Sequence, residues 1–155
     1  MIQRIPSVLV YARHDNAVLV MHRNKDPNLG LWVAPGGKIE LEEAPQDTAK
    51  REMLEETGLV VDALTLRGIC TEVSPRSDWQ WFLFIFETFS FSGELHADLR
   101  EGELAWMPVE TYLHEVSIPQ ADKIFAPQVL DSRTSLFQAK FVYDADLKLV
   151  EWVRY

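Results

Sequence analysis

Apolar residues along this chain fall into runs that short polar segments separate. Most runs are rich in β-branched and aromatic residues, which favour β-strands. We expect strands at residues 7–12, 17–22, 31–34, 60–73, 79–89, 104–107, 136–143 and 147–153. The run WQWFLFIFETF at 79–89 is the most aromatic, so we place it in the centre of a sheet, because exposing it would invite aggregation.

The same pattern predicts helices, which we expect at residues 44–57, 108–115 and 119–130. The first of these carries Pro45 in its first turn, where a missing N–H leaves no hydrogen bond unmade. Gly58 follows at the position where a residue in the left-handed conformation ends a helix. Ala49 and Met53 recur at helical spacing and predict one buried stripe.

The order of elements is strands, one helix, more strands, and then two helices and a closing hairpin. That order fits an α/β fold in which a mixed central sheet carries helices on both faces. A chain of 155 residues can bury a substantial core, so we expect one domain spanning residues 1–155. The hydrophobic content of 47% agrees with a packed globule.

Charge and cysteine content exclude several classes of function. The net charge of −9 argues against broad binding to nucleic acid or to an anionic membrane, which both require a basic face. Cys70 is the only cysteine, so the chain has no internal disulfide and no cysteine-based zinc site. The apolar run near the N-terminus is too short for a signal peptide and no transmembrane segment follows, so we expect a cytoplasmic protein.

Three glutamates on the helix at 44–57 indicate metal chemistry. Glu52, Glu55 and Glu56 are spaced by three and four, so their carboxylates project from a common face. Clustered carboxylates repel one another and raise one another's pKa unless a cation lies among them. Oxygen ligands of this kind suit Mg²⁺ or Mn²⁺ better than zinc.

Neighbouring residues could complete such a site. Arg51 lies four residues before Glu55 and could hold that carboxylate in position. Glu43 lies on the preceding loop, which can fold back over the same helix face. The Pro-Gly-Gly segment at 35–37 supplies flexible backbone that could approach a metal ion or a phosphate.

A solvated, glutamate-rich helix with internal ion pairs is the alternative interpretation, but it leaves the fixed spacing of the flanking residues unexplained. The stretch from Gly37 to Leu59 matches G-x5-E-x7-R-E-U-x-E-E-x-G-U at every position, where U is a large aliphatic residue. This pattern is the Nudix box, and the chain therefore resembles a Nudix hydrolase. The resemblance implies an α/β/α sandwich and metal-dependent cleavage of a nucleoside diphosphate linked to another group.

The resemblance also implies roles for individual residues. The three helix glutamates are expected to be metal ligands, joined by the carbonyl of Gly36. Family members often add an acid from a later loop, for which Glu101 is our candidate, Glu103 is the second choice, and a purely solvated loop glutamate is the alternative.

Catalytic roles within the box stay open. Glu52 is a candidate for the general base, for a metal ligand, or for both. Glu43 could stabilise its loop or assist the base, and Arg51 is expected to be a structural partner of a box carboxylate rather than a phosphate contact. Arg23 and Lys38 are candidates for contacts with substrate phosphates, with ordinary solvated side chains as the alternative.

A second, looser resemblance covers nearly the whole chain and concerns the substrate. Segments at 22–25, 31–38, 78–79 and 137–144 are similar to those of the MutT/MutX type, whose members cleave 8-oxo-dGTP to the monophosphate and pyrophosphate. Asp122 stands where an acid contacts the base in that group. Val33 and Ala121 replace an asparagine and a second acid of the human-type enzyme, so selectivity for 8-oxoguanine does not follow from the resemblance.

A base pocket also needs aromatic or apolar walls. Alternation places Trp79 and Trp81 on one strand face and Phe82 and Phe84 on the other, and one of these faces must be core. We expect Trp79 to contact the substrate, with the alternative that all four rings are core. An exposed Asp122 at the start of a helix would be an equally ordinary finding.

Together these features predict a Mg²⁺-dependent enzyme that hydrolyses a nucleoside triphosphate to monophosphate and pyrophosphate. Its partner is a nucleotide, and the composition is compatible with a monomer or a homodimer. The alternatives are a hydrolase of a dinucleoside polyphosphate, ADP-ribose or a nucleotide sugar, and a non-catalytic nucleotide-binding Nudix module. The complete box favours an enzyme.

Overall fold

The computed structural model describes residues 3–96 and 100–155. Its strands are β1 (Ile5–His14), β2 (Ala17–Arg23), β3 (Trp32–Val33), β4 (Gly36–Lys38), β5 (Val60–Val73), β6 (Trp81–Ser92), β7 (Gly102–Pro108), β8 (Phe137–Tyr143) and β9 (Leu149–Arg154). Its helices are α1 (Pro45–Thr57), α2 (Val109–His114) and α3 (Asp122–Val129). Each expected strand and helix is present, and β4 is an additional strand because its backbone pairs with β1.

The strands form a mixed sheet, as predicted. Their order is β3-β2-β1-β6-β5-β8-β9, with β4 paired to β1 and β7 paired to β2. The β1–β6 and β5–β8 pairs are parallel, and the other pairs are antiparallel. The aromatic strand β6 lies between β1 and β5, which confirms the prediction of a central strand.

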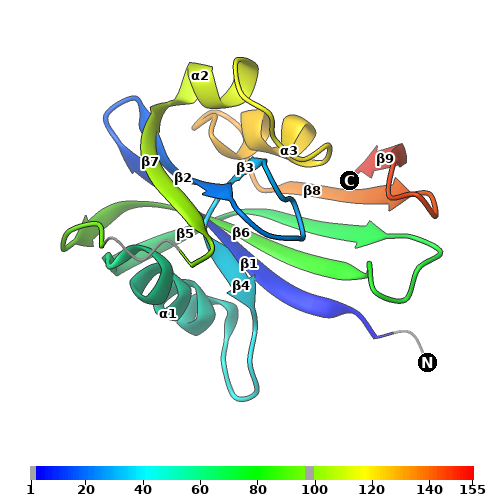
Figure 1. The fold of residues 1–155 in the computed structure, drawn as a ribbon, viewed down its shortest axis with the longest axis horizontal. Coiled ribbons are helices and arrows are strands. Elements are labelled where there is room, and N and C mark those ends of the chain that lie inside the picture. The colour runs from blue at the N-terminus through cyan, green and yellow to red at the C-terminus, as the bar shows by residue number, and fades with distance from the viewer. Residues whose placement is uncertain (1–2, 97–99) are drawn as a thin grey trace.

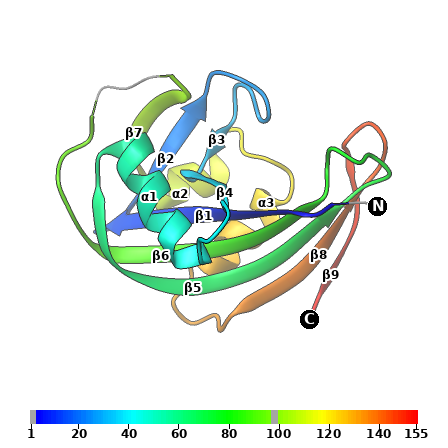
Figure 2. The same cartoon turned by 90° about the horizontal axis from the view of Figure 1, so that it is seen from below.

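Helices cover both faces of this sheet, which confirms the α/β/α sandwich (Figures 1 and 2). On one face, α1 packs over a cluster that includes Val8, Val10, Ala49, Met53 and Phe86. On the other face, α2 and α3 pack over a larger cluster that includes Tyr11, Ile85, Tyr112, Phe125 and Phe141. None of the helices in the described part of the chain is long and apolar enough to span a membrane.

Two expectations about the aromatic strand need correction. The strand begins at Trp81, so Trp79 lies in the turn before it. The prediction that one ring face is core was too narrow, because helices on both sides of the sheet partly bury both faces. Trp81 packs against the α3 cluster, and Phe84 packs against the α1 cluster.

Local irregularities place α3 close to the sheet. The pairing of β5 with β6 shifts register between Leu66 and Gly68, although the strand itself is continuous from Val60 to Val73. A Cβ at Gly68 would lie 3.1 Å from a methyl carbon of Val129 in α3, so the glycine permits close packing of helix on strand. The helix itself begins at Asp122, three residues later than expected, and contains Pro127.

Candidate active site

The box helix presents one face to the core and the adjacent face to an open hollow. Its buried residues are Thr48, Ala49, Met53 and Thr57. Asp47 accepts a hydrogen bond from the backbone N–H of Ala44 at 2.9 Å and fixes the first turn. Gly58 adopts φ 80°, which ends the helix in the left-handed conformation as predicted.

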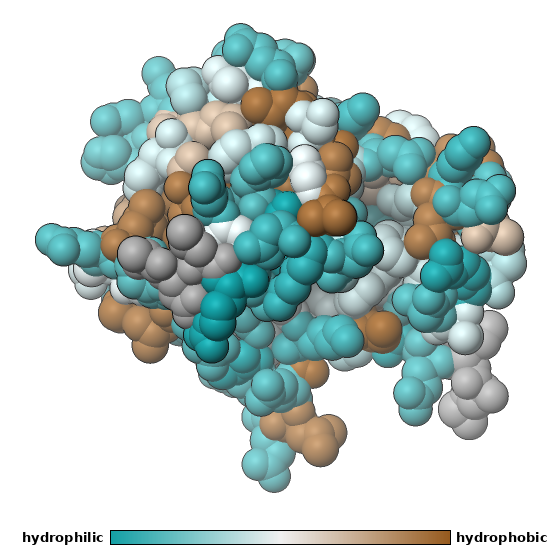
Figure 3. Space-filling model, viewed as in Figure 1, coloured by the Kyte–Doolittle hydropathy of each residue, from teal (hydrophilic) through white to brown (hydrophobic). Residues whose placement is uncertain are grey.

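The hollow has a volume of about 260 Å³, and its wall is largely charged. The residues that line it are Met21, Lys25, Glu52, Glu55, Glu56, Arg100 and Glu101. Hydrophilic side chains gather over α1 on the face that Figure 3 shows. Glu101 is therefore brought beside the three box glutamates, whereas Glu103 is exposed on β7 and does not line the hollow.

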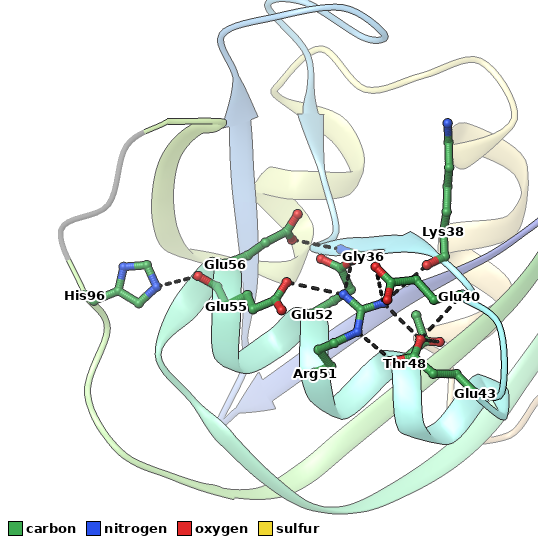
Figure 4. A network of polar contacts seen from close by, with 10 residues as sticks. All are labelled: Gly36, Lys38, Glu40, Glu43, Thr48, Arg51, Glu52, Glu55, Glu56 and His96. Carbon is green, nitrogen blue, oxygen red and sulfur yellow. Dashed lines mark hydrogen bonds and ion pairs between the residues drawn. The ribbon is translucent and has the colours of Figure 1, made fainter.

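Arg51 organises the carboxylates along α1 (Figure 4). Its Nε donates to Glu43 Oε1 at 2.6 Å and its Nη2 to Glu43 Oε2 at 2.9 Å. Its Nη1 donates to Glu52 at 2.9 Å and to Glu55 at 3.3 Å. Hydrogen bonds from Arg51 and Thr48 lower the pKa of Glu43 to about 2. This geometry supports a positioning role for Arg51, since the guanidinium is engaged by carboxylates.

The backbone before the helix fits closely around the same side chains. A Cβ at Gly37 would lie 2.3 Å from Glu52 Oε1, so a larger residue would displace that carboxylate from its observed position. The N–H of Gly36 donates to Glu56 Oε2 at 3.0 Å. The observed contact of Gly36 is thus made by its amide, and its carbonyl stays a proposed ligand.

Glu56 and Glu101 affect each other's pKa. Burial raises the pKa of Glu56 strongly, and the hydrogen bond to Glu101 and the charge of Glu52 raise it further. Partial burial would raise the pKa of Glu101 as well, but the hydrogen bond from Glu56 and the ammonium of Lys25 lower it. Neighbouring carboxylates disfavour each other's charge, and a divalent cation bound between them would relieve that repulsion.

The donor set fits a hard divalent cation. All candidate ligands are oxygens, which Mg²⁺ and Mn²⁺ prefer. Within residues 3–96 and 100–155, no three acidic, histidine or cysteine side chains already form the arrangement of a finished metal site. The residues that would hold the ion are Glu52, Glu55, Glu56 and Glu101, with Gly36 contributing its carbonyl.

The two predicted phosphate contacts lie differently. The Arg23 guanidinium is 3.3 Å from Glu101 and also donates to the carbonyl of Pro27, so it braces the loop at the edge of the hollow. Lys38 is exposed, and Figure 4 shows its side chain pointing away from the carboxylates. The structure does not bring its ammonium into the hollow.

Sequence reasoning missed two basic residues in the hollow, Lys25 and Arg100. The Lys25 ammonium lies 3.1 Å from Glu101, and both residues line the wall. The pairing of Arg23 with Gly102 between β2 and β7 brings the two loops together. Lys25 belongs to the polar loop that follows β2, but only this long-range pairing reveals where the loop lies.

Asp122 lies on the opposite side of the sheet from α1. It is the first residue of α3 and is 6% exposed, so the alternative of an ordinary exposed acid at a helix start was wrong. Burial raises its pKa well above the ordinary value, and the charge of Glu72 adds to this effect. The Trp79 and Trp81 rings stand edge to face, with centroids 5.8 Å apart, on this side of the sheet.

Glu72 is a second buried acid that sequence reasoning did not single out. It is 7% exposed on β5, and burial raises its pKa to about 7. The hydroxyl of Tyr143 donates to its carboxyl at 3.3 Å. Strand alternation offered a signal, because Glu72 follows the buried Cys70 by two residues and must share its face.

Comparisons with known proteins agree with this geometry. The NUDIX domain family model matches residues 1–129. An uncharacterised Nudix hydrolase of Bacillus subtilis, YvcI, is 28% identical over 154 residues, which cover 97% of this chain and 93% of that protein. The solved structure of a MutT protein from Bacillus halodurans is 31% identical with a TM-score of 0.85, and the match covers 97% of each chain.

A shorter match concerns an archaeal relative. The ADP-ribose pyrophosphatase of Methanocaldococcus jannaschii is 33% identical over 93 residues, which cover 57% of this chain and 54% of that protein. The family model spans most of the chain, and the sheet, the box helix and the acidic hollow are those expected for it. The chain therefore belongs to the Nudix hydrolase family.

Proposed function

We propose that this protein is a Mg²⁺-dependent pyrophosphohydrolase that cleaves a nucleoside triphosphate to a nucleoside monophosphate and pyrophosphate. Water adds across one phosphoanhydride bond, so the reaction needs no other co-substrate. An oxidised purine nucleotide such as 8-oxo-dGTP is the substrate we favour. The observation that carries this proposal is the hollow in which four glutamates meet two basic side chains.

The charged side chains of the hollow suit the chemistry of this reaction. A phosphoanhydride is inert because its negative oxygens repel a nucleophile, so cations must offset that charge. When bound, a divalent ion would supply most of this charge at the box glutamates. Lys25 and Arg100 line the same wall and would face the phosphates from the other side.

Glu52 is the box residue best suited to receive a proton from the attacking water. Partial burial raises its pKa, which makes the carboxylate a better base near neutral pH. The hydrogen bond from Arg51 at 2.9 Å fixes its orientation. Glu43 holds Arg51 from the other side, so we assign Glu43 and Arg51 positioning roles.

The face beneath α3 supports a base-binding role for Asp122 and Trp79. Trp79 and Trp81 are partly exposed, and together they offer an aromatic wall beside a buried acid. Pockets for flat heterocycles combine apolar walls with a few polar groups of this kind. We favour a purine triphosphate because the chain resembles the MutT/MutX type, and the similarity to MutT from Bacillus halodurans agrees with that resemblance.

ADP-ribose is a second candidate substrate. The relative from Methanocaldococcus jannaschii bears the name of an ADP-ribose pyrophosphatase and shares 33% identity over its matched part. The same hollow could cleave its diphosphate, because the chemistry at the phosphorus is unchanged. What differs is the group that must occupy the rest of the pocket.

A hydrolysis panel tests the proposal. The purified protein is assayed with 8-oxo-dGTP, dGTP, ATP, a diadenosine polyphosphate and ADP-ribose, and kcat/KM and products are measured. We expect turnover with Mg²⁺, loss of turnover with a chelator, and the highest kcat/KM for 8-oxo-dGTP with monophosphate and pyrophosphate as products. A preference for ADP-ribose would mean that ADP-ribose, and not 8-oxo-dGTP, is the substrate. The absence of turnover with Mg²⁺ or Mn²⁺ would favour a nucleotide-binding module.

A further inference from the structure

Glu72 lies on the same sheet face as the proposed base-binding residues. Its Cα partners are Trp81 on β6 and Phe141 on β8, so it stands in the middle of the sheet. Alternation along β5 places its side chain with that of Cys70, beneath α3. An acid at such a position is uncommon, because desolvation penalises its charge.

Asp122 reaches this face from α3, so two buried acids meet between helix and sheet. They are 6% and 7% exposed. Burial raises the pKa of Asp122 and the charge of Glu72 raises it further, which agrees with the position of both acids on one face of the sheet. Two such groups do not ionise together easily, so we expect at least one of them to be a neutral acid.

The polar groups around the two acids are incompletely paired. Tyr143 donates to Glu72, and the Trp79 indole nitrogen faces the same carboxyl without a hydrogen bond of good geometry. The Oγ of Ser7 is buried without a hydrogen-bond partner, and this side chain is 5% exposed. Alternation with Leu9 directs Ser7 onto the same face.

Unpaired buried donors and acceptors are rare and call for an explanation. Here the unpaired hydroxyl of Ser7 and two acids, beside two partly exposed tryptophans, lie on a single face of the sheet. A flat ligand with a polar edge would satisfy this arrangement, because its ring could stack on the indoles while its edge meets the carboxyls.

We propose that Glu72 is a second base-contacting acid that acts with Asp122 to select a guanine-type purine over adenine. This inference rests on the proposed function, since it places the base of the nucleotide substrate on this face. It adds a specificity-determining residue on β5 that the box and the substrate resemblance do not contain.

The hydrogen-bonding pattern explains the choice of base. The Watson–Crick edge of guanine offers two donors, N1–H and N2–H, beside the O6 acceptor. A carboxylate accepts from both donors, and a neutral carboxyl donates to O6. Adenine offers one acceptor and one donor on that edge, so it would satisfy a single neutral acid and leave the carboxylate unpaired.

Binding of nucleoside monophosphates in the absence of metal tests the inference. Isothermal titration calorimetry with dGMP, 8-oxo-dGMP and dAMP, in a buffer containing chelator, gives the ratio of guanine-type to adenine affinity. For the wild type we expect a preference for the guanine type. In Glu72→Gln we expect this ratio to fall about tenfold to a hundredfold, since one bidentate contact is lost. Asp122→Asn should lower the same ratio.

Tyr143→Phe is the matched control. It removes the hydroxyl bound to Glu72 but keeps the carboxyl, so we expect the ratio of affinities to stay within about twofold. If Glu72 served only to anchor Tyr143, both variants would change the ratio equally. That result, an unchanged ratio in Glu72→Gln, or the absence of any monophosphate binding by the wild type would overturn the inference.

This test is independent of hydrolysis. Because it needs neither metal nor turnover, a failed hydrolysis panel would contradict the proposed reaction and leave the role of Glu72 to be judged by the titrations. Conversely, if the protein hydrolyses nucleotides and Glu72→Gln keeps the wild-type base preference, the proposed role of Glu72 is overturned and the proposed reaction still holds. Thermal denaturation of each variant checks that its fold is preserved.

Discussion

The two faces of the central sheet use carboxylates in opposite ways. On the face of α1, the glutamates lie around an open hollow, and Arg51 compensates much of their charge. On the face of α3, Glu72 and Asp122 are buried with aromatic neighbours and no guanidinium contact among the described residues. The first arrangement suits cations and phosphates, and the second suits a neutral heterocycle whose edge carries polar atoms.

The difference shows that burial and partners, rather than residue type, determine what a carboxyl can do. Hydrogen bonds from Arg51 hold the pKa of Glu43 at about 2, so it is an anion throughout the physiological range. Burial raises the pKa of Glu72 to about 7, so it can be a donor or an acceptor near neutrality. Three experiments would test this contrast between the two faces.

The largest effect should follow the loss of a carboxylate from the hollow. Glu56→Gln removes a proposed metal ligand, and we expect kcat to fall roughly 1,000-fold because charge compensation at the phosphates is lost. Base affinity, measured with monophosphates and no metal, should be unchanged. The matched control is Glu103→Gln, an exposed glutamate of β7 outside the hollow, which should retain near-wild-type kcat.

A smaller effect should appear in the pH dependence of stability. The folded-state pKa of Glu72, about 7, lies above its ordinary value of 4.5, so the folded protein keeps a proton that the unfolded chain releases. The free energy of unfolding should therefore fall as pH rises from about 4.5 to 7, by about 3 kcal/mol at most from this group.

Urea denaturation at pH 4.5, 5.5, 6.5 and 7.5 measures this contribution. The difference in unfolding free energy between wild type and Glu72→Gln should change across that window in favour of the variant, because glutamine does not ionise. A difference that stays constant with pH would mean that Glu72 ionises in the folded protein as readily as in water, and the contrast between the faces would be lost.

A comparable or smaller loss is expected when Arg51 is replaced by lysine. The charge is retained, but one ammonium cannot reproduce the forked contacts with Glu43 and Glu52. We expect kcat to fall 10- to 100-fold, as for other residues that orient metal ligands, with KM little changed. Steady-state kinetics would measure this, and Lys50→Ala, at an exposed position of the same helix, is the control.

Much of the fold and the hollow could be predicted because their signals are local. Strand and helix positions follow from apolar periodicity, and Gly58 and Pro45 mark the ends of the box helix through their own backbone preferences. The spacing of Glu52, Glu55 and Glu56 suffices to place them on one side of α1, since a helix has a fixed period. Glu101 could be proposed only through family resemblance.

What the sequence could not supply depends on contacts between distant segments. Lys25 and Arg100 line the hollow because β2 pairs with β7. Glu72 and Asp122 are fifty residues apart in the chain and meet because α3 packs on β5. The same packing of α3 on the sheet buries Asp122.

The amino-acid sequence alone was sufficient to predict the helices and strands and the mixed sheet with helices on both sides. It also contains the box whose glycines, arginine and glutamates predict metal-dependent chemistry. These features rest on short-range geometry, in which a residue's position along one helix or strand fixes its direction. Which charged groups are buried, which of them are paired, and which second acid lies on the same sheet face as Asp122 could be seen only in the tertiary structure. Those properties arise from desolvation and from long-range pairing, because the surroundings of a side chain come from segments far away along the chain.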